Sequence, residues 1–254
     1  MKRKNLAALI PGLLLIMGVA VAQDDEAPER YTYATYHYCD TSNEGIADEF
    51  VKEKETPVMD KLVDDGVFLS WGWLRHHTGG QWRRIRYFQT SSLNDALAGL
   101  DKMGEAFEAA YGDDDSEGIG VSCKRHDDYV WQAKAGTIGT ERGTAGLSVY
   151  FNCKITDESR ADEIVAEHFA PIYDKLVEEG KITSWGWQSH VLGGWFRRLF
   201  TMTGKDYGTL MDARGEALAA QYGEGNEAGQ EFAKICSGHH DYLWDIVHEK
   251  QGGG

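Results

Sequence analysis

Two kinds of hydrophobic pattern alternate along the chain and predict helices and strands. Apolar side chains recur at helical spacing from Ile164 to Val177 and from Leu93 to Ala110, so both stretches predict amphipathic helices. The segment Tyr31–Asp40 is aromatic and β-branched without a helical period, which is typical of a strand. Phe68–His77 and Trp82–Thr90 predict two further strands joined by a glycine-containing hairpin turn. The chain is therefore expected to combine helices with an antiparallel sheet.

The same order of elements occurs twice because the sequence is duplicated. The segment from Tyr36 to Arg84 returns 114 residues later as Tyr150 to Arg198, and 23 of the 57 positions aligned from Tyr36 onward are identical. The most prominent shared line is Ser-Trp-Gly-Trp, followed by a histidine, a Gly-Gly pair and an Arg-Arg pair. With a last strand near Asp128–Gln132, each copy runs strand, helix, strand, strand, helix, strand. This is the order of a ferredoxin-like unit, an antiparallel sheet with two helices on one face.

The duplication sets the domain boundaries. The first unit is expected over residues 31–134 and the second over residues 146–250, each about 100 residues long. Residues 135–145 between them have the composition of a linker. Residues 23–30 and 251–254 are predicted to be flexible tails.

The first 22 residues have the composition of a cleavable signal peptide. Lys2-Arg3-Lys4 form a positive start, an apolar stretch follows, and Ala20-Val21-Ala22 are the small residues of a cleavage site. A membrane anchor is the alternative, but the stretch is short for a spanning helix and is interrupted by Pro11-Gly12. We therefore expect a secreted or periplasmic protein with no stable membrane insertion after cleavage.

Four cysteines in an exported chain predict disulfides before metal ligands. Each repeat holds an equivalent pair, so we predict Cys39–Cys123 and Cys153–Cys236. In a ferredoxin-like unit the first and last strands are adjacent and antiparallel. Their ends should then lie close enough for each disulfide to form.

The charge and the missing motifs exclude several classes of function. The chain has a formal charge of −15, which becomes −18 once the three positive charges of the signal peptide are removed. Nucleic acids and anionic membranes bind basic patches, so neither is an expected partner. No Walker loop, HExxH, GxSxG, CxxC or CxxCH motif is present. Neither a metal site nor a cofactor is predicted.

A ferredoxin-like unit leaves one sheet face bare, and two in tandem can cover these faces with each other. In this the sequence resembles the dimeric α/β-barrel superfamily, which includes the antibiotic-biosynthesis-monooxygenase, EthD, NIPSNAP and stress-responsive barrel families. The fragment Glu167–Leu176 looks like the His-x-x-Pro helix of some of them, whereas repeat one has Lys54 in place of His168. The resemblance implies two units packed sheet to sheet in a monomeric pseudo-dimer, with higher oligomers left open. For haem-using members it implies an axial histidine, which no motif marks here.

The aromatic candidates for a binding site are Trp71, Trp73, Trp185 and Trp187. Within each pair the two indoles share one face of a strand. One hypothesis places all four between the sheets, against a flat or apolar ligand. The alternative is that they only fill the core.

The polar candidates are Arg84, Arg198 and His168. The two arginines could bind an anionic ligand group, and the alternative is an ion pair with one of the many acids. His168 lies on the apolar stripe of a helix and is a weak candidate for a catalytic base, or a structural core histidine. His76 and His190 are predicted to be structural and to cap the hairpins.

Three functions remain open from the sequence. The leading hypothesis is an exported barrel that binds a small apolar or aromatic molecule between its sheets. The second is a cofactor-independent monooxygenase-like enzyme, which the resemblance implies. The third is a disulfide-linked structural or interaction module with a filled core. A base such as His168 sharing a cavity with an inward arginine would favour the enzyme, and tryptophans that leave no void would favour the third hypothesis.

Overall fold

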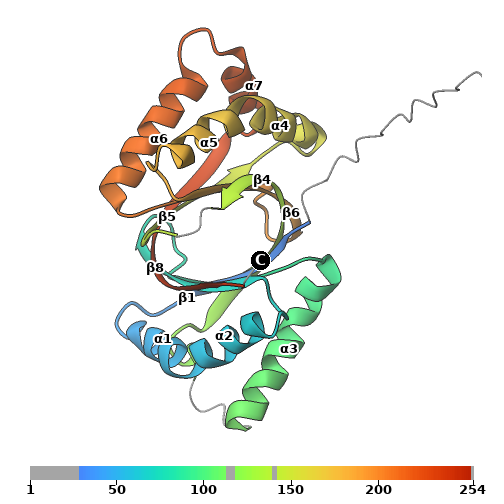
Figure 1. Cartoon of the computed structure of the whole chain (residues 1–254), viewed down its shortest axis with the longest axis vertical. Coiled ribbons are helices and arrows are strands. Elements are labelled where there is room, and N and C mark those ends of the chain that lie inside the picture. Colours follow the sequence, from blue (N-terminus) through green and yellow to red (C-terminus); the bar gives the residue numbers. More distant parts are fainter. Residues whose placement is uncertain (1–28, 113–117, 139–141, 253–254) are drawn as a thin grey trace, which may run out of the picture.

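A computed structural model describes residues 29–112, 118–138 and 142–252, and the predicted signal peptide lies outside these residues. The strands close into one barrel in the order β1-β3-β2-β8-β5-β7-β6-β4 (Figure 1). They are β1 (Tyr31–Tyr38), β2 (Ser70–Thr78), β3 (Arg84–Thr90), β4 (Arg125–Ile138), β5 (Ala145–Asn152), β6 (Ser184–Gly193), β7 (Arg198–Gly204) and β8 (Gly238–Gln251). All neighbouring strands are antiparallel.

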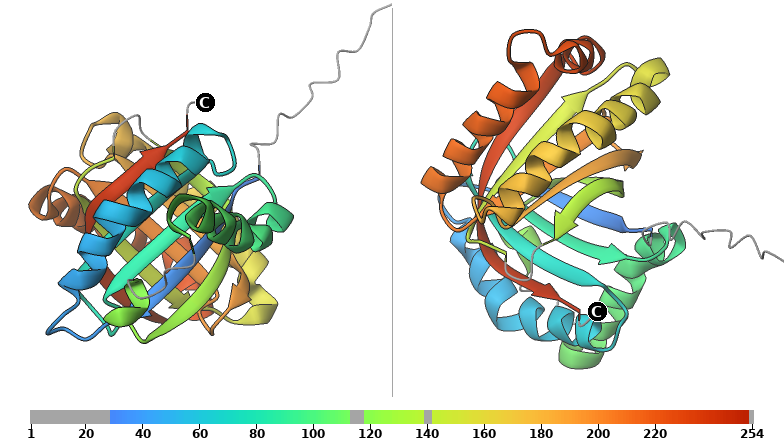
Figure 2. Two further views of the ribbon diagram at one scale, coloured as in Figure 1. Left: turned by 90° about the horizontal axis from the view of Figure 1, so that it is seen from below. Right: turned by 45° about the horizontal axis from the view of Figure 1, so that its top comes forward.

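The helices form two layers on opposite outer sides of the barrel (Figures 1 and 2). The first unit contributes α1 (Gly45–Phe50), a π-helical turn (Val51–Glu55), α2 (Thr56–Asp64) and α3 (Leu93–Tyr111). The second contributes α4 (Glu158–Ile164), a π-helical turn (Val165–Phe169), α5 (Ala170–Glu178), α6 (Tyr207–Tyr222) and α7 (Glu227–Ile235). Short 3-10 turns cover Ile119–Val121 and Ile155–Asp157. The chain is therefore the predicted pair of ferredoxin-like units packed sheet to sheet.

The barrel closes because the last strand of each unit is long enough to pair with both units. These strands are longer than the sequence predicts. β4 and β8 have 14 residues each. Beyond its own sheet, β4 pairs with β6 of the second unit, and β8 pairs with β2 of the first. Residues 135–138, which the sequence assigns to a linker, are the end of β4. The backbone groups of these residues pair with β6, whose edge would otherwise remain open.

Local sequence explains how each first helix is built. Pro57 and Pro171 lie in the first turn of α2 and α5, where a missing N–H is tolerated. The π-helical turn just before each proline absorbs the interruption, so the helix restarts rather than ends. Helix α7 has no counterpart among the sequence predictions. Its N-cap is Asn226, which accepts a hydrogen bond from the backbone N–H of Gly229.

The core has three large parts, one beneath each helical layer and one inside the barrel, and a small fourth cluster of Tyr31, Ala96 and Val130. The interior is aromatic, with Tyr36, Trp131, Tyr150 and Trp244 fully buried. Cys39–Cys123 and Cys153–Cys236 are the disulfides, the two pairs that the repeat predicts. In the described part of the chain, no helix is both long and apolar enough to cross a membrane.

Candidate functional site

The repeated tryptophans face the helices and not the barrel interior. Trp71 and Trp73 belong to the core beneath the first helical layer, and Trp185 and Trp187 to the core beneath the second. Their predicted position between the sheets is therefore wrong, because strand parity shows which residues share a face but not which face the helices cover. Each indole N–H donates to an aspartate of the covering helix. The pairs are Trp71–Asp60 (2.7 Å), Trp73–Asp48 (2.9 Å), Trp185–Asp174 (2.8 Å) and Trp187–Asp162 (2.7 Å).

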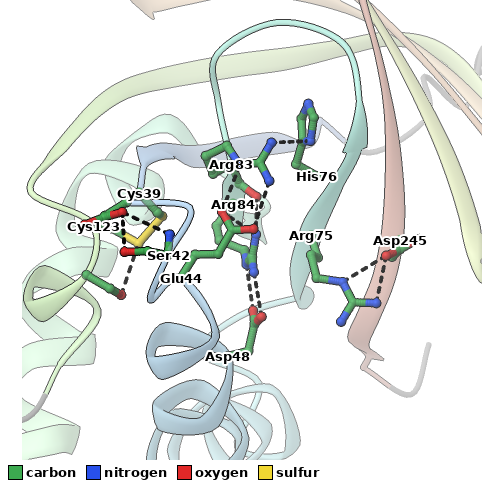
Figure 3. A network of polar contacts seen from close by, with 12 residues as sticks. Cys39, Ser42, Glu44, Asp48, Arg75, His76, Arg83, Arg84, Cys123 and Asp245 are labelled. Carbon is green, nitrogen blue, oxygen red and sulfur yellow. Dashed lines mark hydrogen bonds and ion pairs between the residues drawn. A yellow bond between two sulfur atoms is a disulfide. The ribbon is translucent and has the colours of Figure 1, made fainter.

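The second arginine of each Arg-Arg pair binds an aspartate that also accepts from a tryptophan, Asp48 of α1 or Asp162 of α4. Arg84 donates to both carboxylate oxygens of Asp48, at 2.7 and 2.6 Å, as Figure 3 shows. Arg198 holds Asp162 in the same way, at 2.7 and 2.8 Å. Their side chains are only 2% and 4% exposed. The structure thus matches the ion-pair alternative for both arginines, and their guanidinium forks are occupied by protein carboxylates.

The other repeated polar residues hold the hairpins and the helix starts. Arg83 binds Glu44 at the start of α1 and lies 2.7 Å from Nδ1 of His76 (Figure 3). Arg197 makes the equivalent contacts with Glu158 and His190. Every charged or indole group of the repeated line therefore has a structural partner, in both units.

The Gly-Gly pairs explain how the two units interlock. The hydroxyl of Tyr242, from the second unit, accepts a hydrogen bond from the backbone N–H of Gln81 in the hairpin loop of the first. Tyr129 makes the reciprocal contact with Trp195. A Cβ added at Gly80 or at Gly194 would overlap the tyrosine hydroxyl packed against it. Glycine is required at these positions because the ring crosses so close to the backbone.

A cavity of about 440 Å³ lies between the sheet and the helices of the second unit. Its walls are mainly aromatic and aliphatic. The apolar lining consists of Val149, Phe151, Val165, Phe169, Tyr173, Trp187, Phe200, Leu218, Tyr222, Phe232 and Ala233. Trp187 is the one tryptophan of the repeated line among the lining residues, so the repeated aromatic residues do not fill the second unit completely.

Two polar residues of this cavity, Arg214 and His239, share Asp241 as a partner. Arg214, on α6, donates to one oxygen of Asp241, and Nδ1 of His239 lies 2.7 Å from the other. Arg214 and His239 both line the cavity. Burial raises the pKa of Tyr222 to about 12 and also raises the pKa of Tyr173. Both phenols are therefore neutral hydrogen-bond donors at neutral pH.

The first unit carries different residues at the same positions. Phe169 and Phe200 of the cavity correspond to Glu55 and Arg86. Glu55 is fully buried and forms an ion pair with Arg86 at 3.2 Å. The cavity of the second unit thus depends on positions at which the two copies have diverged.

Two further positions show the same divergence. Phe151 lines the cavity and corresponds to His37 of the first unit, whose imidazole is buried beside Trp73. Arg214, counted back from the Tyr-Gly that ends each second long helix, corresponds to Met103.

The sequence-predicted base is elsewhere. The side chain of His168 is 47% exposed on the π-helical turn, 3.9 Å from Glu167, and it does not line the cavity. The histidine and arginine that share a cavity are His239 and Arg214. His239 belongs to the repeated end motif, so the sequence contained a signal for it. Arg214 has no motif, and only a comparison with Met103 of the other copy marks it.

The lining residues do not fit a haem group. An axial ligand must face the iron from the cavity wall. Of the lining residues, Cys236 is in a disulfide, burial keeps the phenols of Tyr173 and Tyr222 neutral, and the imidazole of His239 is 51% exposed. Within the described ranges, no group of three or more His, Cys, Asp or Glu residues is arranged to hold a metal ion.

Solved structures share this architecture. A candidate monooxygenase of Lactobacillus acidophilus NCFM superposes with a TM-score of 0.61 at 7% identity, over 88% of this chain and 97% of its own. An anthrone oxidase-like protein gives 0.55 at 13% identity, over 90% and 95%. A chlorite dismutase variant of Candidatus Nitrospira defluvii gives 0.53 at 9% identity, over 88% and 92%.

Sequence comparison adds no family to this result. No family model matches the chain, and no curated protein matches it. Identities this low establish the fold alone. The chain is a dimeric α/β barrel whose two halves are joined in one polypeptide.

Proposed function

We propose that this protein is exported and binds a small, largely aromatic molecule in the cavity of the second unit. The observation that carries the proposal is the divergence of the two copies: aromatic residues surround a hollow where the first unit holds the Glu55–Arg86 ion pair. This cavity replaces the space between the sheets as the expected binding site, because aromatic side chains pack that interior. Two disulfides fit the oxidising compartment that export would provide.

The size and walls of the cavity define the ligand class. Its volume of about 440 Å³ lies within the range of small-molecule sites. The rings of Tyr173 and Phe200 lie 4.6 Å apart, and those of Phe169 and Phe232 lie 5.2 Å apart. Such walls offer both faces and edges of aromatic rings, which favours a flat ligand.

The polar end of the cavity defines the expected functional group. The guanidinium of Arg214 has five N–H donors, and its contact with Asp241 uses one of them. A ligand carboxylate, phenolate or enolate facing Arg214 would accept further hydrogen bonds of the charge-assisted kind. The proposed ligand is thus an aromatic ring with an anionic or acidic group at one end.

A second candidate function is oxidation of such a ligand by dioxygen without a cofactor. The favouring observation is the His239–Asp241 contact of 2.7 Å. In the tautomer in which Nδ1 donates to Asp241, Nε2 is an acceptor that can take a proton from a phenol or enol. Arg214 would stabilise the resulting anion, and dioxygen would be its oxidant. The candidate monooxygenase and the anthrone oxidase-like protein among the structural neighbours support this alternative at the level of fold.

Binding of 1-naphthoate and of neutral 1-naphthalenemethanol, measured by isothermal titration calorimetry, tests the proposal. Arg214→Met introduces the residue of the first unit and should weaken naphthoate binding about tenfold, with little effect on the alcohol. The double variant Phe169→Glu/Phe200→Arg copies the ion pair of the first unit and should abolish binding of both probes. Met103→Leu, at the matching position of the first unit, serves as the control. Two results would refute the proposal: wild-type protein that binds neither probe, or variants that bind both as well as wild type.

An oxygen electrode separates the two candidate functions. Consumption of dioxygen with anthrone as the probe, lost in His239→Gln while naphthoate binding persists, would establish the oxidase function. Binding without oxygen consumption would establish a binding protein.

A further inference from the structure

A second hollow lies at the end of the barrel where the two hairpin loops meet. This hairpin pocket, of about 730 Å³, is lined by the loops after β2 and β6 and by the first residues of β4 and β8. Its lining residues are Tyr38, Gly80, Gln81, Trp82, Asp127, Asp128, Tyr129, Gly194, Trp195, Phe196, His240 and Tyr242. It is separate from the cavity of the second unit, with which it shares no lining residue.

Six of the twelve lining residues of the hairpin pocket are Tyr, Trp or Phe. The rings of Trp82 and Tyr242 are stacked with centroids 5.3 Å apart, and Phe196 meets Trp82 edge to face at 5.9 Å. Trp195, beside Phe196, is 68% exposed. This exposed indole extends the group of aromatic residues that lines the pocket.

The charge of the pocket is negative. One carboxylate oxygen of Asp127 accepts hydrogen bonds from the Tyr38 hydroxyl at 2.7 Å and from the Trp82 indole at 2.9 Å. These neutral donors orient the carboxylate without neutralising it, and Asp127 has no ion-pair partner within the described residues. Asp128 also lines the pocket, but alternation along β4 places its carboxylate on the opposite face of the strand, 3.3 Å from His126. The described lining includes no lysine or arginine.

The two copies also differ at this pocket. Trp195 corresponds to Gln81, and Asp127 corresponds to His240. The repeated glycines and tyrosines around them are the same in both units. Divergence therefore places the exposed indole of Trp195 and the carboxylate of Asp127, which has no ion-pair partner within the described residues, in a pocket whose glycines and tyrosines are repeated in both units.

We propose that the hairpin pocket binds an organic cation, an ammonium group bearing apolar substituents. Aromatic faces attract such a cation through their ring quadrupoles, and the Asp127 carboxylate supplies the opposite charge. One face of the Tyr38 ring is already covered by the guanidinium of Arg125, whose Cζ lies 3.8 Å from the ring centroid, so the aromatic surface open to a ligand is mainly the exposed indole of Trp195. The overall charge of −15 also attracts cations to the protein surface.

Choline and its neutral isostere 3,3-dimethyl-1-butanol test the proposal, because they have nearly the same shape and differ in charge. Binding is measured by calorimetry and by the fluorescence of the tryptophans, including exposed Trp195. Choline should bind at least tenfold more tightly than the isostere. Asp127→Asn, which keeps an acceptor for Tyr38 and Trp82, should weaken choline about tenfold. Trp195→Gln, which copies the first unit, should weaken it about fivefold.

The control variant is Glu178→Gln, which removes an exposed charge of α5 far from the lining residues and should leave choline binding unchanged. Because Trp195 is exposed, Trp195→Gln keeps the test interpretable even where Asp127→Asn unfolds. Three outcomes would overturn the proposal. They are no choline binding at millimolar concentration, equal binding of the isostere, and binding of methyl glucoside that Asp127→Asn leaves unchanged, which would indicate a carbohydrate site.

Discussion

Replacing Asp162 tests whether the repeated Trp and Arg residues stabilise the fold by anchoring a helix or instead form a ligand-binding site. Asp162→Ala removes the carboxylate that accepts from Trp187 and pairs twice with Arg198, whose side chain is 4% exposed. Removing one partner of a buried ion pair costs about 3–5 kcal/mol. Arg198 keeps Glu158 at 3.0 Å, so we expect the lower value, about 3 kcal/mol. That loss is about a 150-fold change in the unfolding equilibrium.

The assay is guanidinium unfolding followed by circular dichroism with the disulfides intact. Asp212→Ala, an exposed aspartate of α6, is the control and should change the free energy of unfolding by less than about 0.5 kcal/mol. Adding Arg198→Met to Asp162→Ala should recover more than about 1 kcal/mol, since the double variant no longer buries a guanidinium that has lost two of its acceptors. The reasoning fails if Asp162→Ala costs less than about 1 kcal/mol. It also fails if Arg198→Met abolishes naphthoate binding without affecting stability.

Further predictions concern other structural elements. Burial, then Arg86 and His126, lowers the pKa of His37 to about 3. The unfolded chain therefore binds a proton below about pH 6.5 that the folded chain does not, so stability falls as the pH decreases. His37→Phe, which copies Phe151, should reduce the loss between pH 7 and pH 5 by about 2 kcal/mol in urea titrations, and an unchanged pH slope would contradict this. Gly194→Ala should lower the melting temperature because its Cβ meets the Tyr129 hydroxyl, whereas Gly215→Ala, on an exposed helical site with open space, should raise it. Replacing Cys153 and Cys236 by serine opens a loop of 83 residues and should cost about 4 kcal/mol, measured by denaturant unfolding; a loss below about 1 kcal/mol would exclude the loop-entropy explanation.

The element order and the disulfides could be predicted because each rests on the repeat. Cys39 and Cys123 recur at matching places in the second copy, and that recurrence selects one pairing. The direction of the tryptophans could not be predicted in the same way. Trp71 and Trp73 alternate with Ser70 and Gly72, but the strands of this barrel are covered on both faces, so no polar face marks the outside.

The candidate site was harder to predict than the fold. His168 attracted attention because it lies beside a proline on an apolar stripe, yet the π-helical turn directs it to solvent. The cavity arises from phenylalanines, which resemble ordinary core residues in a sequence. Phe200 becomes informative only once its counterpart Arg86 is known to form a buried ion pair.

The two halves that β4 and β8 hold together belong to one polypeptide, and this affects how substitutions can alter the molecule. In a barrel made from two identical chains, every substitution appears twice, so a residue that opens one site opens both and removes packing from both. In a single polypeptide, a substitution in one half leaves the other half unchanged. One half can keep the buried ion pair of Glu55 and Arg86, while the other has Phe169 and Phe200 at these positions, where they line a cavity. Joining the copies thus allows one half to maintain stability while the other half diverges toward ligand binding.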